Sequence, residues 1–221
     1  MLLKSNTARL VRTTAVAADQ APPSRPLIVL LHGFMGDRRD THSLLRKLSA
    51  EGYACVSIDL PGHGDTARLG DSRVATEAVA SELKALTSDG DAARPLILVG
   101  YSMGGRVAMQ LAASGEQQQQ LPAIMAIIVL SSSPGLVEAP QRAERAARDA
   151  QLSGRLRRMP PAHFAAWLRD EWYRAPLWGP SLSDHPGFEA MLRRRCDGVR
   201  PADRADSLQR ESVGLQPSFW D

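Results

Sequence analysis

Cysteine, lysine and aromatic residues are scarce in this sequence of 221 residues, and it has no long apolar run. The two cysteines, Cys55 and Cys196, form no CxxC pair, which excludes a disulfide framework and a cysteine metal site and favours a reducing compartment. The longest apolar run, LPAIMAIIVL, is too short to cross a bilayer. With 43% apolar and 23% charged residues, the composition is that of one globular domain, or of one domain carrying an insertion.

Because lysine is rare, 24 of the 27 cations are arginine, and residues 141–210 hold 14 arginines against 9 acidic residues. We interpret most of these arginines as solvated helix faces, while a few could bind an anionic substrate through two parallel hydrogen bonds. Nucleic acid is disfavoured as a partner, since the cations neither form a continuous run nor alternate with aromatic residues.

The first 18 residues contain no acidic residue and are rich in Ser, Thr and Ala. This composition is typical of an organelle transit segment, which would place the protein in a plastid or another organelle rather than in the cytoplasm. Residues 1–25 could equally be an N-terminal extension that includes an edge strand.

Apolar runs alternate with helix-like stretches through the first half of the chain. The runs lie at 27–31, 53–59, 96–99 and 124–130, and the helical stretches at 40–50, 74–87 and 104–114. Runs that are apolar on both faces predict a buried, mostly parallel sheet flanked by helices, an α/β core over residues 26–135. The segment SGEQQQQLP predicts a surface insertion without chemistry.

After SSSPGL the strand pattern stops, and residues 136–210 predict an inserted helical cap, followed by a return to the core at 211–221. In HFAAWLRDEWYR, the residues Phe164, Trp167, Leu168 and Trp172 recur at helical spacing. We expect this stripe to pack on the core, although Trp172 and Tyr173 could instead line a pocket.

The segment GYSMG follows a predicted strand and opens a predicted helix. Gly100 and Gly104 leave room for a sharp turn that exposes the hydroxyl of Ser102, the arrangement of a catalytic nucleophile or base. Upstream, LLHGFMGD follows the first core strand. The backbone amides of Phe34 and Met103 are therefore predicted to form an oxyanion hole.

Two histidines precede the serine in glycine-rich loops. We expect His32 of LLHGFMGD to shape its loop rather than to act as a base. His63 of DLPGHG is expected to be structural, because in this type of fold the catalytic acid and histidine follow the serine.

Arg106 lies four residues after Ser102, on the same side of the predicted helix. A cation in the first turn of a helix opposes the helix dipole, which indicates an anion-binding role beside the serine. The alternative is an arginine that reaches solvent or pairs with a nearby acidic residue.

Several motifs occur together and in order: LHGFMGD, DLPGHG, GYSMGGR, SSSPGL followed by QRAERAARD, then WYRAPLW and LQPSFW. From about residue 26 onward, the chain resembles the 2-succinyl-6-hydroxy-2,4-cyclohexadiene-1-carboxylate synthases. These are α/β-hydrolase-fold lyases of menaquinone and phylloquinone synthesis that remove a proton and expel pyruvate.

The resemblance implies a role for each matching residue. Ser102 would be the proton-abstracting base, with Phe34 and Met103 holding the developing negative charge. The substrate carries several carboxylates, and the residues implied to bind it are Tyr101, Arg106, Arg145, Trp172 and Arg194, the last being one choice among Arg193, Arg194 and Arg195.

Family members continue past the QPSFW region with two strands that deliver the catalytic aspartate and histidine, whereas this sequence ends at Asp221. We therefore expect a C-terminally truncated chain with an incomplete sheet, low activity and no family histidine for Ser102; only His163 and His185 follow the serine. A generic esterase or carbon–carbon bond hydrolase, and a non-catalytic carboxylate-binding remnant, stay open as alternatives. No cofactor or metal is expected, because the nucleotide-binding glycine motifs and metal-ligand clusters are missing. The sequence leaves the oligomeric state open.

Overall fold

The computed structural model describes residues 10–15, 25–70, 73–88, 94–114, 121, 123–179 and 182–220. Its centre is a five-stranded sheet in the order β1-β3-β2-β4-β5. The strands are β1 (Arg12–Ala15), β2 (Leu27–Leu31), β3 (Cys55–Ile58), β4 (Leu96–Tyr101) and β5 (Ile124–Leu130). Strands β2 to β5 run parallel, and β1 pairs antiparallel with β3 at the edge. Four of these strands match the predicted apolar runs, and the α/β fold class is confirmed.

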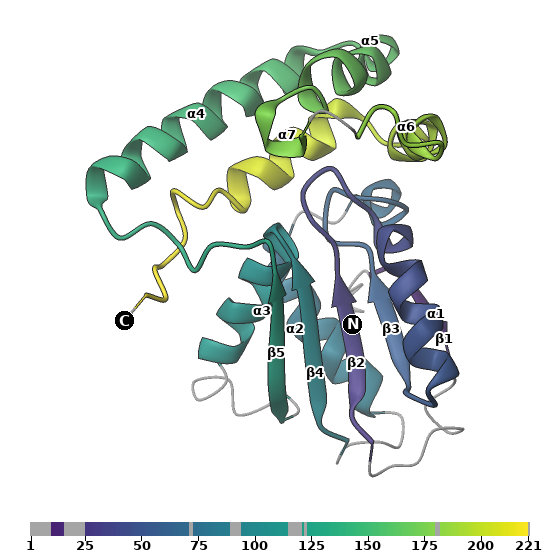
Figure 1. Ribbon diagram of the computed structural model, residues 1–221. Helices are drawn as coiled ribbons and strands as arrows, with labels where there is room; N and C mark the ends of the chain where they lie inside the picture. Colours follow the sequence, from purple (N-terminus) through teal and green to yellow (C-terminus); the bar gives the residue numbers. More distant parts are fainter. Residues whose placement is uncertain are drawn as a thin grey trace, which may run out of the picture.

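Helices cover the sheet from both sides (Figure 1). The helix α1 (His42–Ala50) follows the short η1 (Arg38–Thr41) and packs through Leu45 on one face. On the other face lie α2 (Ala75–Ser88) and α3 (Met103–Ser114), whose apolar residues form the main core with β2, β3 and β4. A further short turn, η2 (Thr66–Leu69), connects β3 to α2. This packing brings the carboxyl ends of β2, β3 and β4 to one edge of the sheet.

Strand β5 differs from the other parallel strands in its exposure. The sequence predicts a buried strand, yet Met125 is 58% exposed and Ile128 48% exposed. Among the described residues β5 pairs with β4 alone, and α1 covers the sheet beside β2 and β3 rather than beside β5. An apolar run shows that a strand can be buried, but the neighbouring elements decide whether it is.

A layer of helices lies across the carboxyl ends of the strands (Figure 1). It consists of α4 (Ala139–Arg158), α5 (Pro161–Trp167), η3 (Leu168–Trp172), η4 (Pro176–Trp178), α6 (Phe188–Cys196) and α7 (Pro201–Arg210). We call residues 139–210 the cap. The described residues from 131 to 220 contain no strand. The cap has its own apolar cluster, in which Phe164, Trp167 and Leu168 are buried. The predicted aromatic stripe thus packs mainly within the cap rather than on the sheet.

The segment after α7 returns to the sheet domain. The amide of Phe219 donates to the carbonyl of Pro134 at 2.7 Å, and the indole Nε1 of Trp220 donates to the carbonyl of Gly135 at 3.0 Å. Gly135 has a φ of 121°, and an added Cβ would lie 2.8 Å from the carbonyl oxygen of Pro217. The return therefore packs against the loop that leaves β5. The predicted transit segment lies mostly outside the described residues, and so do the four glutamines of the predicted insertion.

Candidate active site

Ser102 lies at a strained turn between β4 and α3. Its φ is 50°, a left-handed value that side chains other than glycine rarely adopt. The amides of Gly105 and Arg106 both donate to the carbonyl of Ser102, and the hydroxyl of Ser132 donates to the same oxygen at 2.7 Å. Three donors thus hold the backbone of the turn. The half-buried side chain of Ser102 forms no hydrogen bond within the described part of the chain.

The loop that follows β2 lies directly beside this serine. A Cβ added to Gly33 would lie 2.9 Å from the ring of Tyr101 and 3.2 Å from the Cβ of Ser102, so glycine is needed for the close approach. Met103, the first residue of α3, is buried. Among the described residues, the amides of Phe34 and Met103 donate to no backbone carbonyl. Neither amide is therefore occupied by a backbone carbonyl of the described residues.

The two buried histidines of these loops are held by the backbone. The Nδ1 of His32 bonds the carbonyl of Gly33 at 2.8 Å, and its Nε2 accepts from the amide of Leu60 at 3.0 Å. His63 bonds the carbonyl of Pro61 through Nδ1, and its buried Nε2 has no partner among the residues that the structure describes. Burial lowers the pKa of both imidazoles. These contacts fit the structural roles expected from the sequence.

Arg106 lies in the first turn of α3 and contacts no carboxylate directly among the described residues. Its Nε donates to the side-chain oxygen of Gln216 at 2.7 Å, and its Nη2 donates to the carbonyl of Glu211 at 3.1 Å. It forms no ion pair with a carboxylate among the described residues. Burial lowers the pKa of Arg106 to about 10 and the nearby Arg145 adds to this shift, while the carboxylates of Glu211 and Asp149 partly oppose it. A guanidinium held by neutral oxygens beside a second cation is suited to an anionic ligand.

Arg145 reaches this region from the cap. Its Nε lies 2.9 Å from both carboxylate oxygens of Asp149, one turn further along α4. Asp149 is buried and also accepts from the hydroxyl of Ser212 at 2.7 Å. Arg145 is therefore oriented by an acidic residue of its own helix, and it lies close enough to Arg106 to depress the pKa of that group.

Arg194 is placed differently. It binds Asp37 at 3.0 Å and Asp40 at 2.5 Å, two carboxylates of the sheet domain. Burial alone would lower the pKa of Arg194, but the two carboxylates outweigh it and raise the pKa. The neighbouring Arg195 is buried, pairs with Asp40 at 2.9 Å and donates to the carbonyl of Met35. The charge of Arg194 is thus already matched, which the sequence did not anticipate.

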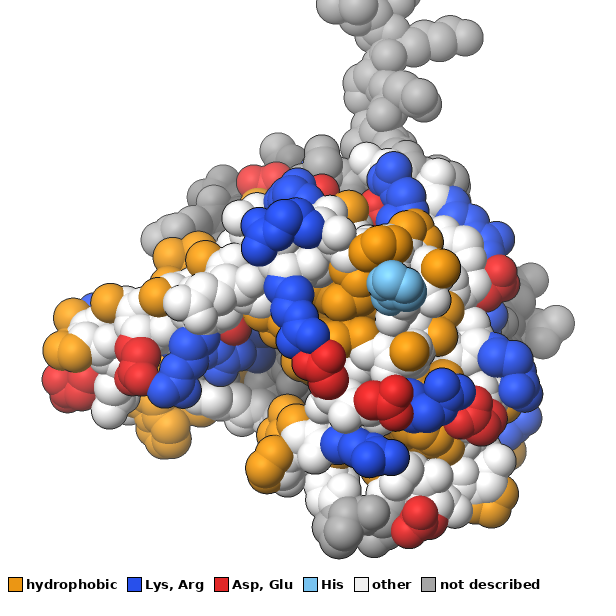
Figure 2. Space-filling model, turned by 90° about the horizontal axis from the view of Figure 1, so that it is seen from above, with side chains coloured by type: hydrophobic (Ala, Val, Ile, Leu, Met, Phe, Trp, Pro, Cys, Tyr) orange, Lys and Arg blue, Asp and Glu red, His pale blue; other side chains and the backbone are white. Residues whose placement is uncertain are grey.

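A cavity of 770 Å³ opens between the loop after β2 and the cap. The sheet domain contributes His32, Gly33 and Tyr101 to its lining, and the cap contributes Tyr173, Arg194 and Arg195. Figure 2 views the cap side of the molecule, where apolar side chains gather around a hollow and charged side chains border them. The cavity is next to Ser102 and has the dimensions of a small-molecule site.

Trp172, a pocket residue according to the resemblance, lies beside Phe34. The structure puts Tyr173, not Trp172, in the lining of this cavity, and burial raises the pKa of Tyr173 to about 12. Trp172 packs edge-on against Phe34, with ring centroids 5.6 Å apart, and its indole Nε1 is buried without a partner. Trp172 therefore covers the predicted oxyanion residue from the cap.

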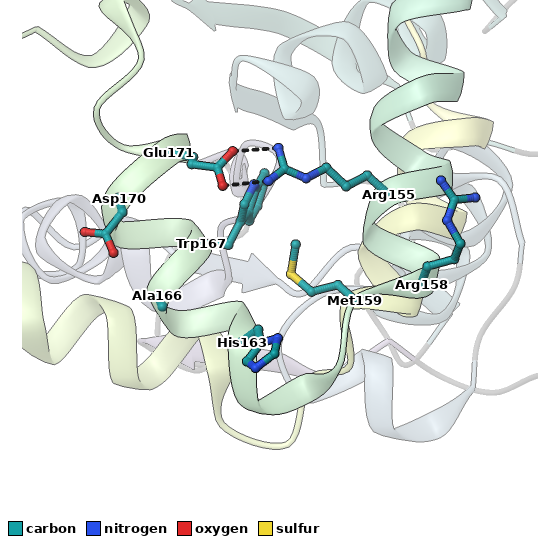
Figure 3. Close-up of a pocket in the computed structure, with 8 residues that line it drawn as sticks. All are labelled: Arg155, Arg158, Met159, His163, Ala166, Trp167, Asp170 and Glu171. Carbon is teal, nitrogen blue, oxygen red and sulfur yellow. Dashed lines mark hydrogen bonds and ion pairs between the residues drawn. The ribbon is translucent and has the colours of Figure 1, made fainter.

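A second cavity, of 460 Å³, lies within the cap between α4 and α5 (Figure 3). Arg155 and Glu171 face each other there through two hydrogen bonds of 2.6 Å, so their charges cancel. His163, one of the two histidines that follow Ser102, is exposed on the lining of this second cavity. The other, His185, is exposed on the lining of the 770 Å³ cavity and accepts a hydrogen bond from the amide of Gly187.

Among the described residues, no group of three or more His, Cys, Asp and Glu side chains is placed to hold a metal ion. None of the described helices is both long enough and apolar enough to span a membrane.

Sequence reasoning missed the residues that orient Arg106. Gln216 and Glu211 come from the return segment after the cap, more than 100 positions away from Arg106. The only signal was the LQPSFW motif, which carries Gln216 without indicating what this residue contacts. Ser132, which fixes the turn at Ser102, likewise lies within the quoted SSSPGL motif.

Known proteins share this arrangement. Residues 28–216 match the model of the alpha/beta hydrolase family. The 2-succinyl-6-hydroxy-2,4-cyclohexadiene-1-carboxylate synthase of Serratia proteamaculans is 32% identical over 90% of this chain and 72% of its own length. The synthase of Escherichia coli O139:H28 is 36% identical over 91% of this chain and 73% of its own length. The structure of MenH from S. aureus superposes with a TM-score of 0.74 at 25% identity, covering 96% of this chain and 74% of that one.

The family model spans both the sheet domain and the cap. The two synthases each match about nine tenths of this chain at identities above 30%. The resemblance noted in the sequence is confirmed. This chain belongs to the 2-succinyl-6-hydroxy-2,4-cyclohexadiene-1-carboxylate synthases of the alpha/beta hydrolase family.

Proposed function

We propose that this chain is a lyase of menaquinone synthesis that removes a proton from a succinyl-bearing cyclohexene carboxylate and expels pyruvate. The observation that carries the proposal is Arg106, a cation without a carboxylate partner among the described residues, one helical turn from Ser102. An enzyme that acts on neutral esters has no use for such a cation, whereas a substrate with several carboxylates requires one.

In this proposal Ser102 abstracts the proton. The strained turn presents its hydroxyl, and the amides of Phe34 and Met103 stabilise the negative charge that develops on the substrate. The aromatic ring of Trp172 over Phe34 lowers the access of water to that amide, which strengthens its interaction with the charge.

Arg106 and Arg145 would bind carboxylates of the substrate from one side. Arg106 keeps two nitrogens on neutral oxygens of Gln216 and Glu211, which orient the group without cancelling its charge. Tyr101 and Arg194 would line the remainder of the pocket. Arg194 would contribute mainly to its shape, because Asp37 and Asp40 already pair with its charge.

Ser102 becomes a base only when another group takes its hydroxyl proton. The described residues place no side chain in hydrogen-bond contact with its hydroxyl; His32 bonds the backbone through both ring nitrogens, and His63 bonds it through Nδ1. The proposal therefore requires a histidine at this hydroxyl, and the described residues do not place one there.

Pyruvate release from the family substrate tests the proposal, followed as NADH oxidation by added lactate dehydrogenase. The chain should release pyruvate at a low but measurable rate, Ser102→Ala should abolish the release, and Arg106→Ala should raise KM. Hydrolysis of simple aryl esters that survives Arg106→Ala, without pyruvate release, would instead identify an esterase. Carboxylate binding without any turnover, unchanged by Ser102→Ala, would identify a non-catalytic binding protein.

The same proposal places the protein in the cytoplasm. Its substrate is a small anion, its relatives named above are bacterial, and its two cysteines are free. Fractionation of source cells would test this, because recovery with an organelle would favour a transit segment at residues 1–18.

A further inference from the structure

The predicted oxyanion loop depends on the cap for its conformation. The amide of Gly36 donates to the carbonyl of Gly33 at 2.9 Å, so Phe34 and Met35 are the two central residues of a tight turn. Met35 has a φ of 63°, a conformation usually taken by Gly or Asn at this place in a turn. A side chain other than glycine is strained in this conformation. Other contacts must hold the turn in this shape.

The first of these contacts is apolar. The side chain of Met35 is 1% exposed and belongs to the apolar cluster of the cap, together with Phe164, Leu168 and Tyr173. A residue of the sheet domain thus contributes to the core of the cap, next to the residue whose amide faces the oxyanion.

The second contact is polar and comes from α6. The Nη1 of Arg195 donates to the carbonyl of Met35, and its Nη2 binds Asp40 at 2.9 Å. Asp40 in turn accepts from the amide of Asp37 at 3.2 Å, at the end of the same loop. One planar guanidinium therefore spans the loop from Met35 to Asp40, which a lysine could not do with the same geometry.

We propose that Arg195 is a positioning residue that sets the oxyanion hole: by holding the carbonyl of Met35 it fixes the direction of the Phe34 amide, so that the hole is complete only when the cap is docked. This inference rests on the proposed function, because that proposal gives the Phe34 amide its role. Arg195 acts through the loop and touches no reacting atom.

The test uses the full chain in four forms: wild type, Arg195→Met, Arg195→Lys and Arg193→Met. Arg193 is the matched control, because it lies on the same helix, is exposed, and has no side-chain hydrogen bond or ion pair in the described part of the chain. The first measurement is hydrogen exchange at the amides of residues 33–36. The second is kcat and KM for pyruvate release.

In Arg195→Met, exchange at residues 33–36 should rise about 10-fold, while exchange in β2 and β4 stays within about twofold. Arg195→Lys should give an intermediate rate, and Arg193→Met the wild-type rate. The kcat of Arg195→Met should fall about 10- to 100-fold with KM within about threefold, because the loop acts in the transition state.

Unchanged exchange at residues 33–36, or an equal rise throughout the protein, would overturn the inference. A loosened loop with unchanged kcat would overturn it as well. If Arg195→Met does not fold, Arg195→Lys against Arg193→Met decides by the same criteria. A loosened loop in a chain whose wild type releases no pyruvate would support the hold of Arg195 on the loop and overturn the proposed function, so the two failures are distinguishable.

Discussion

Two arginines near the candidate site, Arg106 and Arg194, are partnered in opposite ways. Beside α3, Arg106 is held by an amide oxygen and a backbone carbonyl, while its cationic neighbour Arg145 pairs with Asp149. Beside η1, Arg194 is held by Asp37 and Asp40. Burial outweighs the carboxylates of Glu211 and Asp149 and lowers the pKa of Arg106, whereas carboxylates in direct contact raise the pKa of Arg194.

The difference distinguishes an arginine that can bind a ligand from an arginine that stabilises the fold. A matched arginine has already exchanged its hydration for a carboxylate, so a ligand gains little by approaching it. An arginine held by neutral oxygens has no carboxylate that offsets the cost of burying its charge, so an anionic ligand that binds there gains more. Four substitutions can break or sharpen this contrast.

The largest effect is expected from Arg106→Gln. The substitution removes the positive charge that is proposed to bind a carboxylate of the substrate. It should therefore lower kcat/KM about 100-fold, or about 3 kcal/mol. The free energy of unfolding should stay within about 1 kcal/mol, since Arg106 forms no ion pair among the described residues and acts on the carboxylate of Glu211 only from beyond ion-pair distance. Steady-state kinetics and urea unfolding measure the two quantities. A large loss of stability with intact kinetics would show that Arg106 stabilises the fold instead of binding the substrate.

Asp37→Asn should act in the opposite sense, on stability. Burial alone would raise the pKa of Asp37, but Arg194 and Arg39 outweigh it and lower the pKa to about 2. A lowered pKa means that the ionised carboxylate stabilises the fold above pH 4, and that this contribution, about 2 kcal/mol, is lost as the pH falls toward 2.

Urea unfolding between pH 2 and pH 7 measures that contribution. Asp37→Asn should be less stable than wild type at pH 7, and the difference should shrink toward pH 2. A difference that is independent of pH would refute the electrostatic origin.

Gln216→Glu should give Arg106 a carboxylate partner, as Arg194 already has. The carboxylate would face Nε of Arg106, where the amide oxygen now lies at 2.7 Å, and would match its charge as Asp37 matches Arg194. We expect KM to rise about 10-fold, equivalent to about 1.4 kcal/mol, with stability unchanged or higher. The matched control is Gln209→Glu on the exposed face of α7, and a KM equal to wild type in Gln216→Glu would contradict the contrast.

The smallest effect is expected from Arg148→Ala on α4. Arg148 pairs with Glu144 at 2.5 Å, but both side chains are more than 60% exposed. Solvent screens such pairs, so the free energy of unfolding should change by less than about 0.5 kcal/mol and the kinetics not at all. Thermal unfolding and kinetics of this variant give the baseline for the other three.

Local patterns predicted the strands, the flanking helices and the turn at Ser102, because each depends on residues within a few positions of one another. Such patterns did not predict the exposure of strand β5. Its apolar run is partly exposed, because among the described residues it pairs with β4 alone and α1 does not cover it. The partners of the arginines were out of reach for the same reason. Arg194 and Asp37 lie 157 positions apart, and only the docking of the cap on the sheet domain brings them together.

The distribution of tryptophan gives the cap its own optical signal. Of the four tryptophans, Trp167, Trp172 and Trp178 stand in one row of ring contacts in the cap, with successive centroids 5.8 and 6.0 Å apart. The fourth, Trp220, is in the return segment and 61% exposed. Since the sheet domain contains none, tryptophan emission follows the cap and the return segment, while far-ultraviolet circular dichroism also follows the sheet. The loosening of one layer can therefore be watched separately from the melting of the other.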